Sequence, residues 1–148
     1  MNLSYIVNKT ETKDLVYKNL VGNINATSKS TLVNTTDPFI LDYIEWSCNH
    51  LSNVRIVIET TTKDGLLSIG SVPNVNGSTI LSSARPDNIL NNYSGIWDIL
   101  EYNETQNAYK FRWNLKGFEF PKGVHIYIEN TGATVQTAAA IIYGREMK

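Results

Sequence analysis

One cysteine and two histidines are the residues of this sequence best suited to nucleophilic or metal chemistry. Cys48 and His50 lie two positions apart, whereas His125 lies in a distant segment. A histidine-based metal site needs at least three converging ligands, and His125 and Glu129 would lie about 13 Å apart along a strand. Cys48 shares a strand face with Trp46, which is typical of a buried structural thiol. We therefore expect no metal site, no cofactor and no catalytic cysteine.

Carboxylates offer a second route to catalysis. Asp98, Glu101 and Glu104 lie close together in the sequence, and Glu119 follows in a later segment. A glycoside hydrolase needs two carboxylates about 5–10 Å apart, one of them in an apolar pocket. The spacing allows that arrangement, but no motif selects a pair, and the phosphate-binding glycine motifs are absent from the sequence. The chain is therefore predicted not to be an enzyme, and a glycoside hydrolase is kept as a third alternative.

Aromatic side chains supply the remaining candidates for binding. Phe118 and Phe120 share one side of an extended segment, which is bounded by Lys116-Gly117 and Lys122-Gly123. That segment is either a contact loop that inserts into a partner or a cap over the end of the fold. Other aromatic residues flank a long loop or face outward on a strand, where they could form a stacking platform for sugar rings. The candidate partner contacts are Phe118, Phe120, Tyr93, Trp97 and Tyr127.

Strands must place these side chains, because no long window of the sequence carries the apolar stripe of a helix. Residues 53–61, 108–115 and 124–129 alternate between apolar and polar side chains, which is typical of strands with one buried face. Residues 39–48 are predicted to form a longer strand. We assign to one face of it Ile40, Ile44, Trp46 and Cys48.

A turn motif connects two of these runs. Asn130-Thr131-Gly132 predicts a hairpin between residues 124–129 and a return strand over residues 134–143. The small residues Ala138 and Ala140 lie on one face of the return strand. They let another layer of the fold or another subunit come close.

Irregular segments account for the rest of the chain. Residues 116–123 are predicted to form an exposed bend between strands. Residues 83–95 are predicted to form a long loop in which Pro86 starts one helical turn. A first hairpin is expected from residues 3–7 and 15–21, and weaker strands or turns at residues 31–34, 63–65, 66–69, 78–82 and 97–102.

The composition fits one domain of strands. The chain has 148 residues and a mass of 16.6 kDa, which is enough to bury a core without disulfides or metals. Nine or ten short strands at this spacing predict an all-β fold, a single antiparallel β-sandwich of jelly-roll type over residues 1–148. The net charge of −1 gives no basic face for nucleic acid. No apolar run is long enough for a membrane helix, and the first residues lack the pattern of a signal peptide, so we expect synthesis in a cytoplasm.

The last part of the chain carries the motif apolar-Pro-x-Gly, a strand, Glu-Asn-Thr-Gly and a second strand. In this sequence it reads Phe120-Pro121-Lys122-Gly123, then Glu129-Asn130-Thr131-Gly132, then Ile141-Ile142-Tyr143-Gly144. This pattern resembles the closing hairpin of small β-sandwich structural proteins of tailed-phage virions. The Asn-rich composition fits that class, and the resemblance transfers no catalytic or binding residue.

The resemblance implies a non-enzymatic structural protein of a phage virion. Such a protein decorates the capsid or joins the head-tail region, as a homo-oligomer or as repeated copies against capsid or connector subunits. The contacts would come from sheet edges, the N-terminal segment and the loops 83–95 and 116–123. The alternative is a carbohydrate-binding or receptor-binding module, which would use exposed aromatic and amide side chains to hold a glycan.

Overall fold

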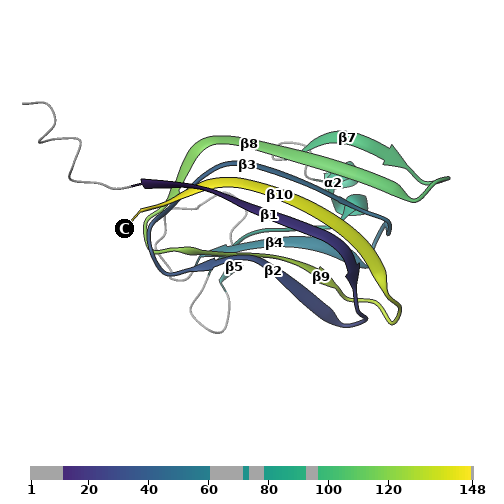
Figure 1. Cartoon of the computed structure of the whole chain (residues 1–148). Coiled ribbons are helices and arrows are strands. Elements are labelled where there is room, and N and C mark those ends of the chain that lie inside the picture. Colours follow the sequence, from purple (N-terminus) through teal and green to yellow (C-terminus); the bar gives the residue numbers. More distant parts are fainter. Residues whose placement is uncertain (1–11, 61–71, 74–78, 93–96, 148) are drawn as a thin grey trace, which may run out of the picture.

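Two antiparallel sheets pack face to face in the computed structural model, which describes residues 12–60, 72–73, 79–92 and 97–147 (Figure 1). Sheet A has the strand order β1-β10-β3-β8-β7, and sheet B has the order β2-β9-β4-β6-β5. The strands are β1 (Thr12–Ile24), β2 (Ser28–Thr35), β3 (Phe39–Cys48), β4 (Val54–Thr60), β5 (Val72–Pro73), β6 (Thr79–Ala84), β7 (Asp98–Asn103), β8 (Ala108–Phe120), β9 (Val124–Asn130) and β10 (Gln136–Met147), and α2 (Pro86–Asn92) is helical.

The strand order is that of a jelly roll. From β1 to β4 the chain alternates between sheet A and sheet B, and from β8 to β10 it alternates again. The resulting order, β1-β10-β3-β8 facing β2-β9-β4-β6, is that of two interleaved Greek keys. The short strands β5 and β7 extend one edge of each sheet. The predicted all-β jelly-roll sandwich is therefore confirmed, although β1 and β8 have 13 residues each and are not short.

The regular alternations predict the buried faces correctly. Along β9, Val124, Ile126 and Ile128 are buried and the residues between them are half-exposed. Strand β4 buries Val54, Ile56 and Ile58 in the same way, although Val57 between them is also buried, and β8 buries Tyr109 and Phe111. These side chains meet between the sheets in one continuous apolar core.

Strand β3 has the predicted bounds, but its buried face changes parity. Phe39 and Leu41 are buried before the change, and Ile44, Trp46 and Cys48 are buried after it. The register shifts on both sides of the strand next to Asp42, so one extra residue is inserted there. Ile40 consequently lies on the half-exposed face, and its assignment to the face of Ile44 and Trp46 is wrong.

The predicted hairpin at Asn130-Thr131-Gly132 is wrong. Strand β9 pairs with β2 and β4 in sheet B, whereas β10 pairs with β1 and β3 in sheet A. The connection therefore crosses from one sheet to the other. Its backbone bonds go to other loops, because Thr131 N–H donates to the carbonyl of Asn53 and Thr27 N–H donates to the carbonyl of Gly132.

The segment expected to be an exposed bend is mostly strand. Strand β8 continues through Phe120, and only Pro121, Lys122 and Gly123 form the turn to β9. The helical turn starting at Pro86 is confirmed as α2, and the weaker strands at 31–34, 78–82 and 97–102 correspond to β2, β6 and β7. Residues 15–21 lie within β1. The expectations for residues 3–7, 63–65 and 66–69 lie outside the described residues.

Candidate functional site

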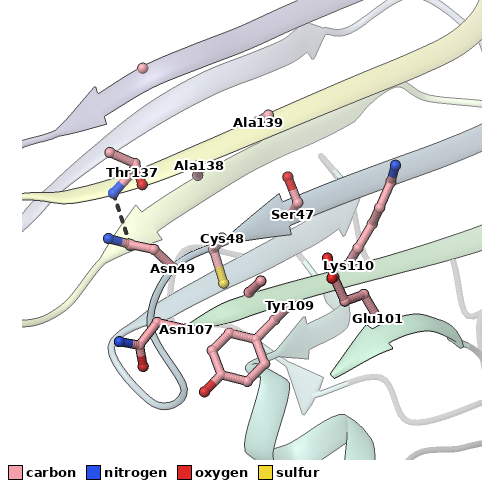
Figure 2. A pocket seen from close by; sticks show the side chains of 12 residues that line it. Ser47, Cys48, Asn49, Glu101, Asn107, Tyr109, Lys110, Thr137, Ala138 and Ala139 are labelled. Carbon is pink, nitrogen blue, oxygen red and sulfur yellow. Dashed lines mark hydrogen bonds between the residues drawn. The ribbon is translucent and has the colours of Figure 1, made fainter. Parts of the chain in front are cut away.

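A groove lies on the outer face of sheet A (Figure 2). It has a volume of about 520 Å³. Five strands contribute to its wall, near the ends of β1, β3 and β7 and the starts of β8 and β10. The groove residues are Gly22, Ser47, Cys48, Asn49, Glu101, Asn107, Ala108, Tyr109, Lys110, Thr137, Ala138 and Ala139.

Small residues at outward positions create this groove. In the sheet register, Ser47 of β3 pairs with Ala139 of β10 on one side and with Lys110 of β8 on the other. Lys110 in turn pairs with Glu101 of β7. The small side chains of β3 and β10 leave space above these strands. Lys110 and Glu101 border that space on the side of β8 and β7 (Figure 2).

A second hollow of about 180 Å³ adjoins the groove. It shares Ser47, Lys110 and Ala139 with the groove and is also bordered by Glu45 and Ile141. The Lys110 ammonium lies 3.7 Å from a carboxylate oxygen of Glu45. The two hollows therefore form one trough along the outer face, with a charged rim on one side and an apolar residue on the other.

Asn49 closes one end of the groove. Its side-chain oxygen accepts a hydrogen bond of 3.0 Å from the Thr137 backbone N–H (Figure 2). The Asn49 backbone N–H donates back to the Thr137 carbonyl at 3.2 Å. This pair of bonds continues the pairing of β3 with β10 beyond the last strand residue and fixes the groove wall.

Cys48 is buried beneath the groove, where burial disfavours the nucleophilic thiolate form. Its thiol donates a 3.5 Å hydrogen bond to the carbonyl of His50. Burial raises the pKa of the Cys48 thiol to about 12, and the hydrogen bond to His50 opposes that shift only in part. The thiol therefore stays protonated at neutral pH.

We predict that Cys48 reacts slowly with thiol reagents in the folded protein. A pKa near 12 in place of about 8.5 lowers the thiolate fraction at pH 8 by roughly 10³-fold. Because the folded-state pKa is raised, stability should also fall as the pH rises above the unfolded-state pKa. Absorbance with a disulfide reagent, with and without urea, measures the difference, and fast labelling of the folded chain would contradict the prediction.

The outer face of sheet B carries a histidine held by two neighbours. His125 Nδ1 lies 3.1 Å from a Glu59 carboxylate oxygen, and His125 Nε2 lies 3.4 Å from the Thr31 hydroxyl. This order of contacts is that of a hydrolase triad. The Thr31 contact is long for a hydroxyl donor, the hydroxyl is exposed, and neither hollow includes these residues. We assign His125 no catalytic role.

Sequence reasoning missed the Glu59 contact because it depends on the pairing of β4 with β9, which are far apart in the chain. Among the described residues, no group of three or more histidine, cysteine or acidic side chains could hold a metal ion. No helix in the described part of the chain is long and apolar enough to span a membrane.

Tyr127, a predicted partner contact, is half-buried on the outer face of sheet B. Its ring centroid lies 4.7 Å from that of His125, and the Lys29 ammonium lies 4.8 Å from it. Burial raises the pKa of its hydroxyl, and Glu59 adds to that shift. The Tyr127 ring is therefore engaged by neighbours of its own chain.

Trp97 and Phe120 are core residues, so they cannot contact a partner. Each has an exposed fraction of 1%. Trp97 packs edge-on against Trp46 and Trp113, with ring centroids 6.2 and 5.6 Å apart. Phe120 is buried because β8 extends further than the sequence indicates, and Trp97, just before β7, is buried among the core aromatic rings.

Phe118 is partly buried and packs against the core. Its ring centroid lies 5.1 Å from that of Phe120. Tyr93 lies outside the described residues. The structure therefore does not bring the five predicted contact residues together on one surface.

No protein-family model matches this chain, and no curated protein is detectably similar to it in sequence.

An apolar strip on β10 is a surface feature that the sequence analysis missed. Ile141 and Tyr143 point away from the core, with exposed fractions of 37% and 45%. Tyr43 of β3 packs edge-on against Tyr143, with ring centroids 5.8 Å apart. The inward positions of β10 hold Ala138, Ala140 and Ile142. The available signal was the placement of Val135, Ile141 and Tyr143 on one face of the strand, opposite the small residues Ala138 and Ala140.

Proposed function

We propose that this chain is a non-enzymatic structural protein of a tailed-phage virion, which decorates the capsid or joins the head-tail region through contacts with other subunits. The observation that carries the proposal is the apolar strip on β10. The solvent-facing side of an antiparallel sheet is normally polar, yet Ile141 and Tyr143 lie exposed on the outer face of sheet A. Exposed apolar patches on a folded domain are typical of protein–protein contact surfaces.

The fold and the sequence pattern support the same proposal. Jelly rolls occur in viral capsid proteins and in lectins, although a fold by itself does not fix a function. The pattern from Phe120 to Gly144 resembles that of small virion proteins of tailed phages in sequence alone, because β9 and β10 lie in different sheets and form no hairpin. The proposed partners are capsid or connector subunits, with neither nucleic acid nor a membrane as a direct ligand, and the proposed location is the virion.

Labelling of purified particles tests this proposal. Antibodies raised against the full chain should bind intact particles of the phage that encodes it, at regularly repeated positions in electron micrographs. Mass spectrometry of gradient-purified particles should find the chain at many copies per particle. Its absence from washed particles, together with abundance in the free lysate, would contradict a structural role.

A carbohydrate-binding module is the second candidate, favoured by the groove on sheet A. Its volume of about 520 Å³ lies within the range of small-ligand sites. Amide, hydroxyl and charged side chains at its wall, including Asn107, Ser47 and Lys110, can bind sugar hydroxyls. Trp97, which the sequence placed among the sugar-stacking candidates, is buried and does not line this groove.

We predict the following if a glycan occupies the groove. Lys110→Met should weaken binding on a glycan array by about tenfold, the loss expected for one charged hydrogen bond. Lys122→Met, at an exposed lysine of the turn after β8, is the matched control and should bind as the native chain does. Equal binding by both variants would exclude the groove as the glycan site.

A further inference from the structure

We infer that the outer face of sheet A is the contact surface between two copies of this chain. This inference rests on the proposed function and names one of its contacts. Two adjacent features of the face carry it. The ridge consists of Ile141, Tyr143 and Tyr43, and the trough consists of the two hollows whose floor includes Ser47 and Ala139.

The two outer faces of the sandwich differ in character. On sheet B, charged residues satisfy one another: Arg55 donates to Glu129 at 2.7 Å, and His125 lies 3.1 Å from Glu59. These ion pairs make the exposed part of that face polar, as expected of a sheet facing solvent, although Val57 between Arg55 and Glu59 is buried. On sheet A the ridge exposes apolar surface with no covering element among the described residues. Sheet A is therefore the face that gains from a partner.

The ridge and the trough are positioned for self-association. Ile141 belongs to the ridge and also borders the smaller hollow. A two-fold axis passing near β10 would therefore place the ridge of each copy over the trough of the other. Two-fold contacts use the same patch on both subunits, so a patch containing both a protrusion and an adjacent hollow is self-complementary.

The charges of the face also fit a second copy. In the sheet register Asp98 pairs with Arg112, and Glu101 pairs with Lys110. Acidic and basic side chains thus lie opposite one another on β7 and β8, and Glu45 lies close to Lys110 at the edge of the trough. A face of one sign would repel its own copy, whereas a mixed face can meet acidic with basic groups across a two-fold axis.

The size of the face is sufficient. Sheet A has five strands, which at about 4.8 Å per strand span about 24 Å, and ten residues of strand extend about 33 Å. The face therefore offers on the order of 800 Å² per copy. That is the area each partner buries in a standard stable interface.

Sedimentation of the full-length chain over a wide concentration range tests the inference. The native chain should form a dimer, and Ile141→Lys should raise its dissociation constant at least about 30-fold, as expected for a central apolar contact. Leu90→Lys is the matched control, because Leu90 is 48% exposed on α2 and is not part of the ridge or the trough. It should leave the dissociation constant unchanged, and thermal unfolding should show both variants folded.

A charge exchange provides a second readout on the same face. Lys110→Glu should weaken the dimer, and adding Glu101→Lys in the same chain should restore it, because the two positions are paired across the strands. A native chain that stays monomeric at every concentration would overturn the inference, as would a dimer indifferent to Ile141→Lys. A monomer that binds a glycan in the trough would also overturn it and would favour the second candidate function.

Failure of this inference is distinguishable from failure of the virion role. A monomeric chain that still labels intact particles would refute the two-copy contact alone. A dimer disrupted by Ile141→Lys but absent from particles would refute the virion role alone.

Discussion

Gly123→Ala should destabilise the protein by about 2–5 kcal/mol, a large part of the total stability of a domain this size. Gly123 has φ of +92°, in a region that side chains with a Cβ rarely adopt. A Cβ there would lie 2.0 Å from the Thr35 carbonyl oxygen and 2.6 Å from the Thr36 Cα. These are backbone atoms, so the clash can be relieved only by moving the end of β2. Backbone strain and overpacking contribute about 1–2 and 1–3 kcal/mol respectively.

Gly117→Ala is the matched control for that substitution. Gly117 has a similar φ of +86°, but a Cβ there would meet its nearest atoms at 3.7–3.8 Å, which is ordinary contact. It should lose only the backbone contribution, about 1–2 kcal/mol. Urea unfolding followed by tryptophan fluorescence measures both variants. Equal losses would show that the turn after β8 relaxes freely and would contradict the expected clash.

Asn130→Asp should strongly destabilise the protein. Asn130 is fully buried at the end of β9. Its amide NH₂ donates to the carbonyls of Ile24 and Thr134 at 3.0 and 2.7 Å, and its oxygen accepts from the Gly132 N–H at 2.9 Å. A carboxylate would face two carbonyl oxygens with no proton to donate. We expect a loss of about 3–5 kcal/mol at pH 7.

The pH dependence of the Asn130→Asp variant gives the second half of this prediction. Burial and the two facing carbonyls should raise the pKa of the new carboxyl above its unfolded value. The folded state then binds more protons than the unfolded state, so stability is retained at low pH and lost as the pH rises through the folded-state pKa. Urea midpoints at pH 4 and pH 7, compared with those of the native chain, measure the effect.

Asn103→Asp is the control for the same change. Asn103 uses its side-chain oxygen to accept the Gln106 N–H at 3.0 Å in an exposed turn. A carboxylate keeps that bond, so this variant should differ from the native chain by less than about 0.5 kcal/mol. A matching loss at both positions would mean that the Asn130 bonds do not hold the loop between the sheets.

The buried face of a strand could be predicted where apolar and polar residues alternate without interruption. The residues of β9 repeat with a period of two, and each apolar member is buried. In β3 the two-residue alternation fails at Asp42. An extra residue is inserted there, so the residues after it point to the opposite face from the one that the alternation predicts. The sequence does not mark such an insertion, since it depends on how two neighbouring strands align.

The candidate site was less predictable than the fold. Trp97 and Phe120 were expected at a partner surface and lie in the core, whereas Ile141 and Tyr143 lie exposed on β10. Both the groove and the ridge are assembled from strands distant in sequence, so no local spacing marks them. Apolar character alone tells neither which face of a strand meets the core nor which neighbours leave a hollow beside it.

The sequence alone determined that this chain forms strands, which face of β9 is buried, and where α2 begins. These properties follow from local alternation and turn chemistry. Only the tertiary structure decided that β9 and β10 belong to different sheets, although Asn130-Thr131-Gly132 has the composition of a hairpin turn. The physical reason is that a turn fixes only a local change of direction. Which strand fills each place beside β9 and β10 depends on the competition among all strands for backbone partners and for burial of one apolar face.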